Sequence, residues 1–425
     1  MAERLYYSDS HLRTFSARVT DIRELSRTEG QSVWQVALER TAFYPTSGGQ
    51  PYDTGVLSAT SRGGAVLEVP VIAVEEDEQG EVWHQILKPL LAGTEVKGEI
   101  DWPRRLDHMQ QHSGQHLLSA VFARELQAPT VSFHLGETSS TIDLAVDSIA
   151  HHSLERAERI ANELIVENRA VAVRKVDRAE ADALLAAGAL RKLPERQGTI
   201  RLIEIADCDL NACGGTHVRS TGEIGGLLIR GVERVRQGTR VEFVCGLRAV
   251  TAARQDFSVL SRGAALLSMP RTEVAEGIER IIAETKAGAK ELQKLREELA
   301  TYHAVRLAVE EQIVDHLRLV KRSFADRDGD YVKLLASRLA ASVPQTVALL
   351  VSTQQDPALV ILARSGDLDF HAGNLMKEAL AQIGLRGGGS ADLGQGRVPH
   401  EQTAALLDAM SEAVRNAVAS ASETV

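Results

Sequence analysis

The segment from about Thr272 to Leu319 constrains this chain most. Gly and Pro become rare there, Glu, Lys, Ala and Leu dominate, and apolar or small residues recur every three or four positions. Such spacing predicts a long helix with a heptad-like seam. The seam consists of Ile278, Ile281, Gly288, Leu292, Leu295, Leu299, Tyr302 and Val309, and Thr285 and Arg306 interrupt it. Two interpretations stay open: a helix packed on its own protein, or a coiled-coil arm that pairs two chains.

The sequence before this helix predicts strands first and a mixed structure later. Residues 14–100 contain short alternating segments separated by Gly, Asp and Ser, which favour an antiparallel barrel or sandwich. Asp101-Trp-Pro103 opens a helix that continues to about Gln127, because proline suits a first helical turn. Further elements are expected as strands within 129–145, a helix over 152–171, short strands with turns over 171–244, and a helix over 179–187.

The sequence after the long helix predicts alternating helices and strands. Expected are helices over 331–341 and 372–383, strands over 345–352 and 358–363, and a glycine-rich segment over 384–396. Alternation of this kind favours a small three-layer domain. The complete chain is therefore expected to have an α+β multidomain fold.

Composition limits the possible partners and the cellular compartment. The chain has 425 residues, 48 Lys plus Arg and 58 Asp plus Glu, so its net charge of −10 requires any nucleic-acid surface to be local. Three cysteines exclude a disulfide scaffold and fit a reducing cytoplasm. The N-terminus lacks a signal-peptide pattern, and the longest apolar runs fall far below the ~20 residues that span a bilayer. We expect a cytoplasmic protein without a membrane partner.

Two short motifs predict a metal site. His112-Ser-Gly-Gln-His116 places two imidazoles one helical turn apart, and Cys213-Gly-Gly-Thr-His217 combines a thiolate with a third imidazole in a glycine-rich turn. Three nitrogens and one sulfur suit tetrahedral Zn²⁺. Each motif alone could arise by chance, and Cys208 is an alternative thiolate. We favour Cys213 because its glycines leave room for an ion.

A metalloprotease is not expected from these motifs. The glutamate of a His-Glu-x-x-His protease is absent, because Ser113 occupies its place. His108 lies four residues before His112 on the same predicted helix. It could hydrogen-bond to one of the metal-binding histidines, although we favour the interpretation that it is a partly exposed helix residue.

Three blocks of this sequence resemble the editing domain of alanyl-tRNA synthetase, and they occur in that family's order. The blocks are Phe43-Tyr-Pro-Thr-Ser-Gly-Gly-Gln50 with Asp53-Thr-Gly55, then Arg104–Phe122, then Leu210-Asn-Ala-Cys-Gly-Gly-Thr-His-Val218 with Thr221-Gly-Glu-Ile-Gly225. The C-terminal segments Arg386-Gly-Gly-Gly389 and Gly394-Gln-Gly396 resemble the C-terminal domain of the synthetase, which is related to the DHH-phosphoesterase-associated domain.

The resemblance implies a domain organisation. The barrel begins near residue 14, which leaves no room for an aminoacylation core, so the chain resembles a freestanding long-form AlaX-type editing protein. The implied domains are a glycine-motif β-barrel (1–100), a zinc-containing α/β editing core (101–250), a helical or coiled-coil linker (251–329) and a DHH-associated-type α/β domain (330–425).

The resemblance also implies a reaction. It is hydrolysis of the ester that joins a wrong amino acid, serine or glycine, to the 3′ end of tRNA(Ala). A second hydrolytic sieve is useful because binding separates small side chains only ~10–200-fold. The implied cofactor is Zn²⁺, held by His112, His116, Cys213 and His217.

The glycine motif is expected to form the second half of the site. Gly48 and Gly49 could aim backbone N–H groups at an anion. Gln50 could hold a water or the substrate carbonyl, and Thr46 could pair with the hydroxyl of a seryl group. His134 is a lesser candidate for contact with the terminal adenosine, with a structural role equally open.

Candidate tRNA contacts are basic or glycine-rich. They are Arg230, Arg234, Arg236 and Arg240 near the end of the editing core, and Arg386, Gly387, Gly388 and Gly389 near the C-terminus. Side chains and backbone donors of this kind contact phosphates, and the alternative is a solvated face paired with Glu233 and Glu242. A homodimer through the helical linker or the C-terminal domain is possible.

Two other function classes compete with the deacylase. One is a noncatalytic tRNA-binding protein with a structural zinc. The other is a DHH-type phosphoesterase, which is disfavoured because its Asp-His-His signature is absent.

Overall fold

The computed structural model describes residues 1–28, 31–61, 63–190, 193–194, 198–236 and 238–422. It divides into two compact units, Met1–Arg262 and Gly263–Val425. The predicted boundary after residue 100 coincides with the end of a strand, whereas the boundary after 250 falls inside a helix, α4 (Gly246–Leu266). The four-part domain division stays a prediction.

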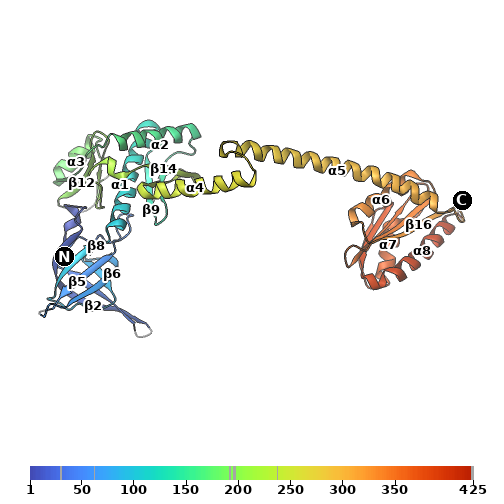
Figure 1. Ribbon diagram of the computed structural model, residues 1–425, viewed down its shortest axis with the longest axis horizontal. Coiled ribbons are helices and arrows are strands. Elements are labelled where there is room, and N and C mark those ends of the chain that lie inside the picture. Colours follow the sequence, from blue (N-terminus) through green and yellow to red (C-terminus); the bar gives the residue numbers. More distant parts are fainter. Residues whose placement is uncertain (29–30, 62, 191–192, 195–197, 237, 423–425) are drawn as a thin grey trace. The chain divides into compact units, whose positions relative to one another are not determined.

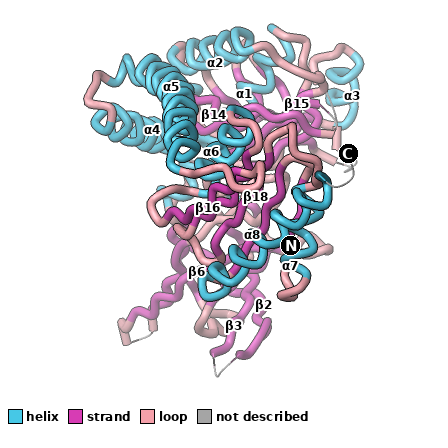
Figure 2. The backbone as a smooth tube through the Cα atoms, turned by 90° about the vertical axis from the view of Figure 1, so that its right-hand side faces the viewer, coloured by secondary structure: helices cyan, strands magenta, loops and turns pink. Residues whose placement is uncertain are grey.

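The first unit begins with a closed barrel of six antiparallel strands in the order β2–β3–β7–β6–β5–β8 (Figure 1). The strands are β2 (Thr14–Thr28), β3 (Gln31–Leu38), β5 (Gly55–Thr60), β6 (Val66–Glu76), β7 (Val82–Ile86) and β8 (Glu95–Ile100). Figure 2 shows β2 beside β3, its antiparallel partner. Phe15, Ala17 and Val19 are buried at alternate positions, as a strand with one inward face requires. The predicted barrel is confirmed.

Two short elements precede or flank the barrel. The β1 strand (Glu3–Arg4) pairs in parallel with β4 (Arg40–Thr41), and the 3-10 turn η1 (Leu5–Tyr7) follows β1. These contacts hold the N-terminal segment against the chain that leads into the glycine motif.

The helix α1 (Trp102–Glu125) runs through the centre of the first unit, and nearly all of its residues from Met109 to Phe122 are buried. Asp101 caps its N-terminus, with the carboxylate accepting a hydrogen bond from the Arg104 N–H at 3.4 Å. Around it lie two small sheets, ordered β14–β15–β10–β9 and β11–β12–β13, and the helix α2 (His151–Val166).

The remaining elements of the first unit follow the predicted alternation. They are β9 (Thr130–Leu135), β10 (Ser140–Leu144), β11 (Val171–Val176), α3 (Arg178–Ala186), β12 (Ile200–Ile205), β13 (Asp209–Ala212), η2 (Thr221–Ile224), β14 (Leu227–Val235), β15 (Gly238–Cys245) and α4. The core of this part of the unit is formed by α1 with the helices and strands around it.

The second unit is a three-layer domain built on a five-stranded sheet in the order β16–β17–β18–β20–β19. Val347, Leu349 and Val351 of β17 point to one side of the sheet, while Ala348 and Leu350 point to the other. Helices α7 (Ala372–Ala381) and α8 (His400–Ser422) cover the first side, and α6 (Gly329–Ser342) with the end of α5 (Val274–Glu310) covers the second (Figure 1).

The bounds of the second unit correct one prediction. Its elements are η3 (Arg271–Glu273), α5 (Val274–Glu310), β16 (Arg318–Phe324), α6 (Gly329–Ser342), β17 (Thr346–Ser352), β18 (Ala358–Arg364), α7 (Ala372–Ala381), β19 (Gly387–Gly389), β20 (Leu393–Val398) and α8 (His400–Ser422). The long helix was expected to reach about Leu319, but it ends at Glu310. The chain leaves the helix through a turn between Val314 and Leu317, with positive φ at Asp315 and His316, and β16 then pairs in parallel with β17.

The seam of α5 lies on a different face of the helix from its intramolecular contact. Ala300, Ala304 and Leu307 are buried against α6, whereas the seam residues Leu292, Leu295 and Leu299 are about half exposed. Within this unit the seam therefore has no apolar cover from the described elements. None of the described helices is both long and apolar enough to cross a bilayer.

Candidate metal centre

Four ligand atoms from two distant segments meet beside α1. His112 and His116 lie one turn apart on the helix, and Cys213 and His217 lie on the loop after β13; their ligand atoms are all within 4.8 Å of one another. Cys213 Sγ is 3.4 Å from His112 Nε2 and 3.3 Å from His217 Nε2. Tetrahedral zinc with ordinary bond lengths would separate S and N ligands by about 3.5 Å. The donor set therefore fits a metal, and the role of these residues as zinc ligands stays a prediction.

The loop that carries Cys213 requires glycine at one position. A Cβ atom on Gly215 would stand 2.1 Å from the His112 ring, so any other residue would displace the imidazole. Gly214 has more space, with the Tyr7 hydroxyl as its nearest neighbour at 3.8 Å. Close packing of Gly215 on His112 thus brings the loop to the helix.

Each histidine of the set has a partner on its Nδ1 atom, which leaves Nε2 free to face the centre. His112 Nδ1 lies 2.9 Å from Gln50 Oε1, His116 Nδ1 lies 3.1 Å from Asp209 Oδ2, and His217 Nδ1 lies 3.1 Å from Ser113 Oγ. Partners of this kind fix the orientation of metal-bound histidines. Sequence reasoning missed Asp209 and gave Ser113 no role, because nothing in the pattern links either residue to an imidazole.

The buried charges of the set favour a thiolate. Burial raises the pKa of the Cys213 thiol, but the nearby His112 and His217 and hydrogen bonds from the imidazoles outweigh it and hold this pKa well below its usual value. Burial lowers the pKa of His217 to about 3. Burial also lowers the pKa of His116, but hydrogen bonds to Asp209 and Cys213 outweigh it and raise this pKa to about 10. A metal that binds here would meet a preformed thiolate.

The glycine motif forms a tight turn next to this centre. Ser47 and Gln50 exchange two backbone hydrogen bonds, and φ is +54° at Gly48 and +80° at Gly49. Positive φ at both central residues defines a type I′ turn, which glycine adopts without strain. Gly49 packs under the Phe133 ring, where a Cβ atom would stand 2.8 Å from Cε2.

The turn leaves polar groups exposed. Gly48 and Gly49 are exposed, and their backbone N–H groups have no hydrogen-bond partner among the described residues. Thr46 is exposed as well, and only its backbone N–H is bonded, to the Val74 carbonyl at 3.2 Å. The N–H groups of Gly48 and Gly49 and the hydroxyl of Thr46 therefore remain available to a ligand.

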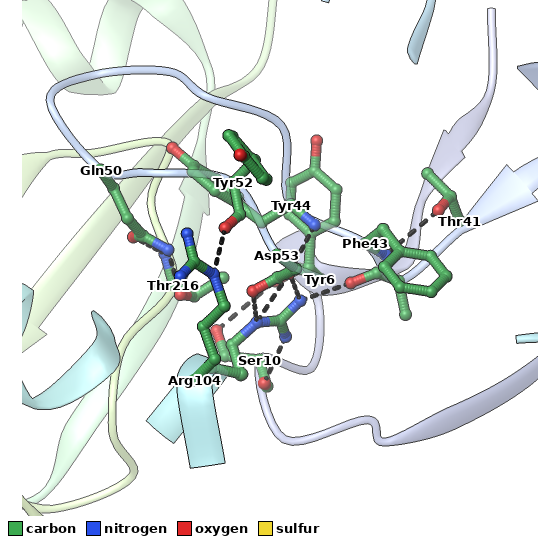
Figure 3. Close-up of polar contacts among 12 residues, drawn as sticks. Tyr6, Ser10, Thr41, Phe43, Tyr44, Gln50, Tyr52, Asp53, Arg104 and Thr216 are labelled. Atoms are coloured by element: carbon green, nitrogen blue, oxygen red, sulfur yellow. Dashed lines mark hydrogen bonds and ion pairs between the residues drawn. The ribbon is translucent and has the colours of Figure 1, made fainter. Parts of the chain in front are cut away.

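Gln50 has a different environment from the one predicted. Its side chain is fully buried, with Oε1 accepting hydrogen bonds from the Thr216 backbone N–H at 3.0 Å and from His112, and Nε2 donating to Thr216 Oγ1 at 2.8 Å (Figure 3). The amide is therefore not placed to hold a water or the substrate carbonyl. It joins the barrel to the Cys213–His217 loop and orients His112.

His134 does not lie at the centre. The neighbouring Phe133 packs on Gly49, and its ring centroid is 5.9 Å from that of His112. Successive residues of a strand point to opposite faces, so His134, exposed on β9, points away from the site. Phe133 is the aromatic residue that borders the centre, and the contact of His134 with substrate stays a prediction.

The structure also shows the surroundings of His108 and Cys208, for which the sequence left two roles open. His108 is only 3% exposed, so the expected partly exposed residue is wrong; burial, with the charges of Arg104 and Arg248, lowers its pKa to about 3. Its Nδ1 has no hydrogen-bond partner among the described residues, and His108 is not part of the His/Cys cluster. Cys208 is buried outside the cluster, and burial raises its pKa.

A buried ion pair fixes the glycine motif to α1. Arg105 and Asp53 are both fully buried and hydrogen-bonded. Asp53 also accepts a hydrogen bond from the Tyr44 backbone N–H at 2.6 Å (Figure 3), and Arg105 donates to the carbonyls of Ser10 and Ala42. The pair therefore ties the segment that carries the turn to the helix that carries His112.

The predicted tRNA-contact residues divide into two groups. Arg230 pairs with Asp256, and Arg240 pairs with Asp143 at 2.7 Å and Glu233 at 3.5 Å, so these two follow the paired alternative. The exposed Arg234, Arg236 and Arg386 form no ion pair within the described part of the chain.

The glycines at 387–389 have structural reasons of their own. A Cβ atom on Gly387 would stand 2.2 Å from Leu380 Cδ1, and one on Gly389 would stand 1.9 Å from the Leu393 carbonyl oxygen. Gly388 alone faces open space. Close packing explains two of the three glycines, and their contact with phosphate stays a prediction.

Family models match three parts of the chain. The model described as "Threonyl and Alanyl tRNA synthetase second additional domain" matches residues 200–241, which include Cys213 and His217. The "tRNA synthetases class II (A)" model matches residues 2–104, which contain the barrel and the glycine turn. The "DHHA1 domain" model matches residues 318–416, and it starts at the first residue of β16.

Curated relatives fall into two kinds. Alanine–tRNA ligase from Pyrococcus abyssi is 33% identical over 93% of this chain and 42% of the ligase, and that from Halobacterium salinarum is 32% identical over 97% and 43%. The alanyl-tRNA editing protein AlaX-L from Pyrococcus horikoshii is 29% identical over 94% of this chain and 95% of its own length. The chain spans less than half the length of the ligases it matches.

The matches define a chain that contains the second additional domain of threonyl and alanyl-tRNA synthetases and a DHHA1 domain. The chain is a homologue of the alanyl-tRNA editing protein AlaX-L over nearly the whole length of both sequences. The predicted resemblance is thereby confirmed.

Proposed function

We propose that this protein is a trans-editing aminoacyl-tRNA deacylase. It hydrolyses Ser-tRNA(Ala) and Gly-tRNA(Ala) in the cytoplasm and releases the free amino acid and tRNA. The observation that carries the proposal is the four-ligand cluster beside an exposed glycine turn, in a homologue of an alanyl-tRNA editing protein.

The glycine turn supplies hydrogen-bond donors to the reacting ester. The exposed N–H groups of Gly48 and Gly49 stabilise the oxygen that becomes negative when water attacks the carbonyl. Thr46, at the start of the turn, offers its hydroxyl to the serine side chain. Alanine would leave this hydroxyl unpaired, and an unpaired polar group in a closed site weakens binding.

The residues His112, His116, Cys213 and His217 would hold Zn²⁺. The bound ion would supply positive charge beside the reacting ester. Four protein ligands would leave no open position for water, which favours positioning over activation of water. Gln50, Asp209 and Ser113 hold the imidazoles in the required orientation.

Binding of tRNA uses local positive charge on an acidic protein. Arg234, Arg236 and Arg386 are exposed cations without ion-pair partners among the described residues, so they can contact phosphates. Arg230 is not among these phosphate contacts, because its charge is paired with Asp256.

Two copies of the chain pair through the α5 seam. Seven apolar residues at heptad-like spacing remain 43% or more exposed: Ile278, Ile281, Leu292, Leu295, Leu299, Tyr302 and Val309. A coiled coil buries such a seam. Leu295→Glu should shift the sedimentation of the protein towards the monomer, whereas Lys290→Glu should not. An unchanged sedimentation distribution for both variants would contradict pairing through the seam.

A deacylation panel tests the function. Purified protein is incubated with tRNA(Ala) charged with serine, glycine or alanine, and loss of ester is followed against buffer. The alternative is a noncatalytic tRNA-binding protein with a structural zinc, which a complete four-ligand site also suits. That alternative predicts bound tRNA with ester decay equal to buffer.

A further inference from the structure

A cavity of about 440 Å³ shares a wall with the metal centre. Cys213 and Gly214 form that wall, and Tyr7, Lys175, Ile200 and Arg201 are among the other residues that line the cavity. Its volume falls within the range of small-molecule sites. The deacylation chemistry proposed above does not use it.

Two cations lie side by side in the lining of this cavity, and the Lys175 ammonium also donates to Ser8 Oγ at 3.3 Å. Lys175 of β11 and Arg201 of β12 are direct antiparallel partners, so their side chains leave the same face of the sheet. Like charges directly opposite each other in a sheet are destabilising. An anion between the two cations would remove this repulsion.

Arg201 has a donor that the protein itself does not use. Its Nε donates to the Tyr7 carbonyl at 3.0 Å and its Nη1 to the Cys213 carbonyl at 2.6 Å. The third nitrogen, Nη2, is buried without a hydrogen-bond partner among the described residues. An acceptor in the cavity would satisfy this buried donor.

An aromatic ring completes the lining. The guanidinium of Arg201 lies 5.6 Å from the centroid of the Tyr7 ring, and Ile200 adds apolar surface. Proteins bind unpaired bases by stacking them on such rings and bind phosphates with Lys and Arg. Cations, a ring and an apolar floor together match a nucleotide.

We propose that this cavity binds the 3′-terminal nucleotide of the tRNA acceptor end, with its phosphate between Lys175 and Arg201 and its base or ribose against Tyr7. This inference rests on the proposed deacylase function. The shared Cys213–Gly214 wall explains why the aminoacyl ester, attached to that nucleotide, would reach the metal centre.

Direct binding tests the cavity without using the reaction. Adenosine 5′-monophosphate, adenosine and inorganic phosphate are titrated into the metal-loaded full chain. The nucleotide should bind about tenfold or more tighter than either fragment, because charge-assisted contacts and stacking are both needed. Equal affinity for inorganic phosphate and the nucleotide would make this an anion site and overturn the proposal.

Matched variants locate the binding. Lys175→Glu should weaken nucleotide binding about tenfold or more, whereas Lys88→Glu, an equal charge change on an exposed barrel residue, should leave it unchanged. Tyr7→Leu should weaken binding and Tyr7→Phe should retain it, because phenylalanine keeps the ring. Wild-type affinity in both Lys175→Glu and Tyr7→Leu would overturn the assignment.

Kinetics separates this inference from the function on which it rests. Lys175→Glu should raise KM for Ser-tRNA(Ala) about tenfold with little change in kcat, as expected for lost ground-state and transition-state binding alike. Hydrolysis by the wild type with an unchanged KM in this variant would overturn the cavity alone. Absent hydrolysis by the wild type would overturn the function, while nucleotide titration still reports on the cavity.

Discussion

The side-chain oxygen of Gln50 accepts a hydrogen bond from His112 Nδ1 at 2.9 Å. The same oxygen accepts the Thr216 backbone N–H, and this fixes which end of the amide faces the imidazole. His112 must then donate through Nδ1, so its Nε2 carries the lone pair that a metal needs. The glycine motif and the metal centre are therefore one structural unit.

Gln50→Ala should weaken zinc binding about 10–100-fold, the range expected when a partner of a metal-bound histidine is lost. The affinity is measured by competition with a chromophoric chelator. Gln79→Ala, which changes an exposed glutamine of the same barrel, is the control. Equal zinc affinity in wild type and Gln50→Ala would show that this hydrogen bond does not support the metal.

The three cysteines should differ sharply in metal content and reactivity. Cys213→Ala should lose bound zinc by elemental analysis, whereas Cys208→Ala should retain it, because only Cys213 belongs to the cluster. In the metal-free protein near neutral pH, iodoacetamide should modify Cys213 first. Its pKa is lowered, so the thiolate is present, while burial raises the pKa of Cys208 and Cys245. Full zinc occupancy in Cys213→Ala would refute the ligand set.

The Asp53–Arg105 pair should dominate the stability of the first unit. Arg105→Met leaves a buried carboxylate unpaired, which should lower the free energy of unfolding by about 3–5 kcal/mol. The three tryptophans, Trp34, Trp83 and Trp102, all lie in this unit, so their fluorescence follows its unfolding alone.

A milder variant and a surface control make this stability prediction specific. Asp53→Asn keeps the side-chain shape and should also destabilise, which covers the case in which Arg105→Met does not fold. Arg18→Met removes an exposed partner of Glu95 on the same barrel and should cause no measurable change. Equal midpoints in urea for Asp53→Asn and wild type would contradict the assigned role of the pair.

Thr46→Val should reduce the preference for serine. Valine keeps the shape of threonine but lacks the hydroxyl, so the ratio of seryl to alanyl hydrolysis should fall about five- to tenfold, the value of one hydrogen bond. Thr60→Val, at an exposed end of β5, should leave this ratio unchanged. A wild-type ratio in Thr46→Val would exclude this residue from selection of serine.

The sequence predicted the ligand set better than its surroundings. Fixed spacing within one helix and within one turn is visible in a sequence, and it grouped His112 with His116 and Cys213 with His217. Contact between Asp209 and His116, 93 residues apart, depends on how β13 packs on α1, and spacing cannot show this. The sequence pointed to His134 and not to its neighbour Phe133 for a similar reason. Adjacent residues of a strand point to opposite faces, and spacing alone does not show which face borders the site.

The bounds of the elements show the same limit. The end of α5 was placed too late, at about Leu319. The helix ends at Glu310, and the chain turns between Val314 and Leu317 with positive φ at Asp315 and His316 before β16 begins. Neither central residue of this turn is a glycine, so the local composition did not mark it. The glycines of the I′ turn, in contrast, were recognisable because positive φ restricts the residues that can stand there.

Deacylation of Ser-tRNA(Ala) by the metal-loaded wild-type protein, compared directly with Ala-tRNA(Ala), tests the central claim. The account predicts loss of the seryl ester well above the buffer rate and slow loss of the alanyl ester. Decay of both esters at the buffer rate, by protein that still binds zinc and tRNA, would contradict it.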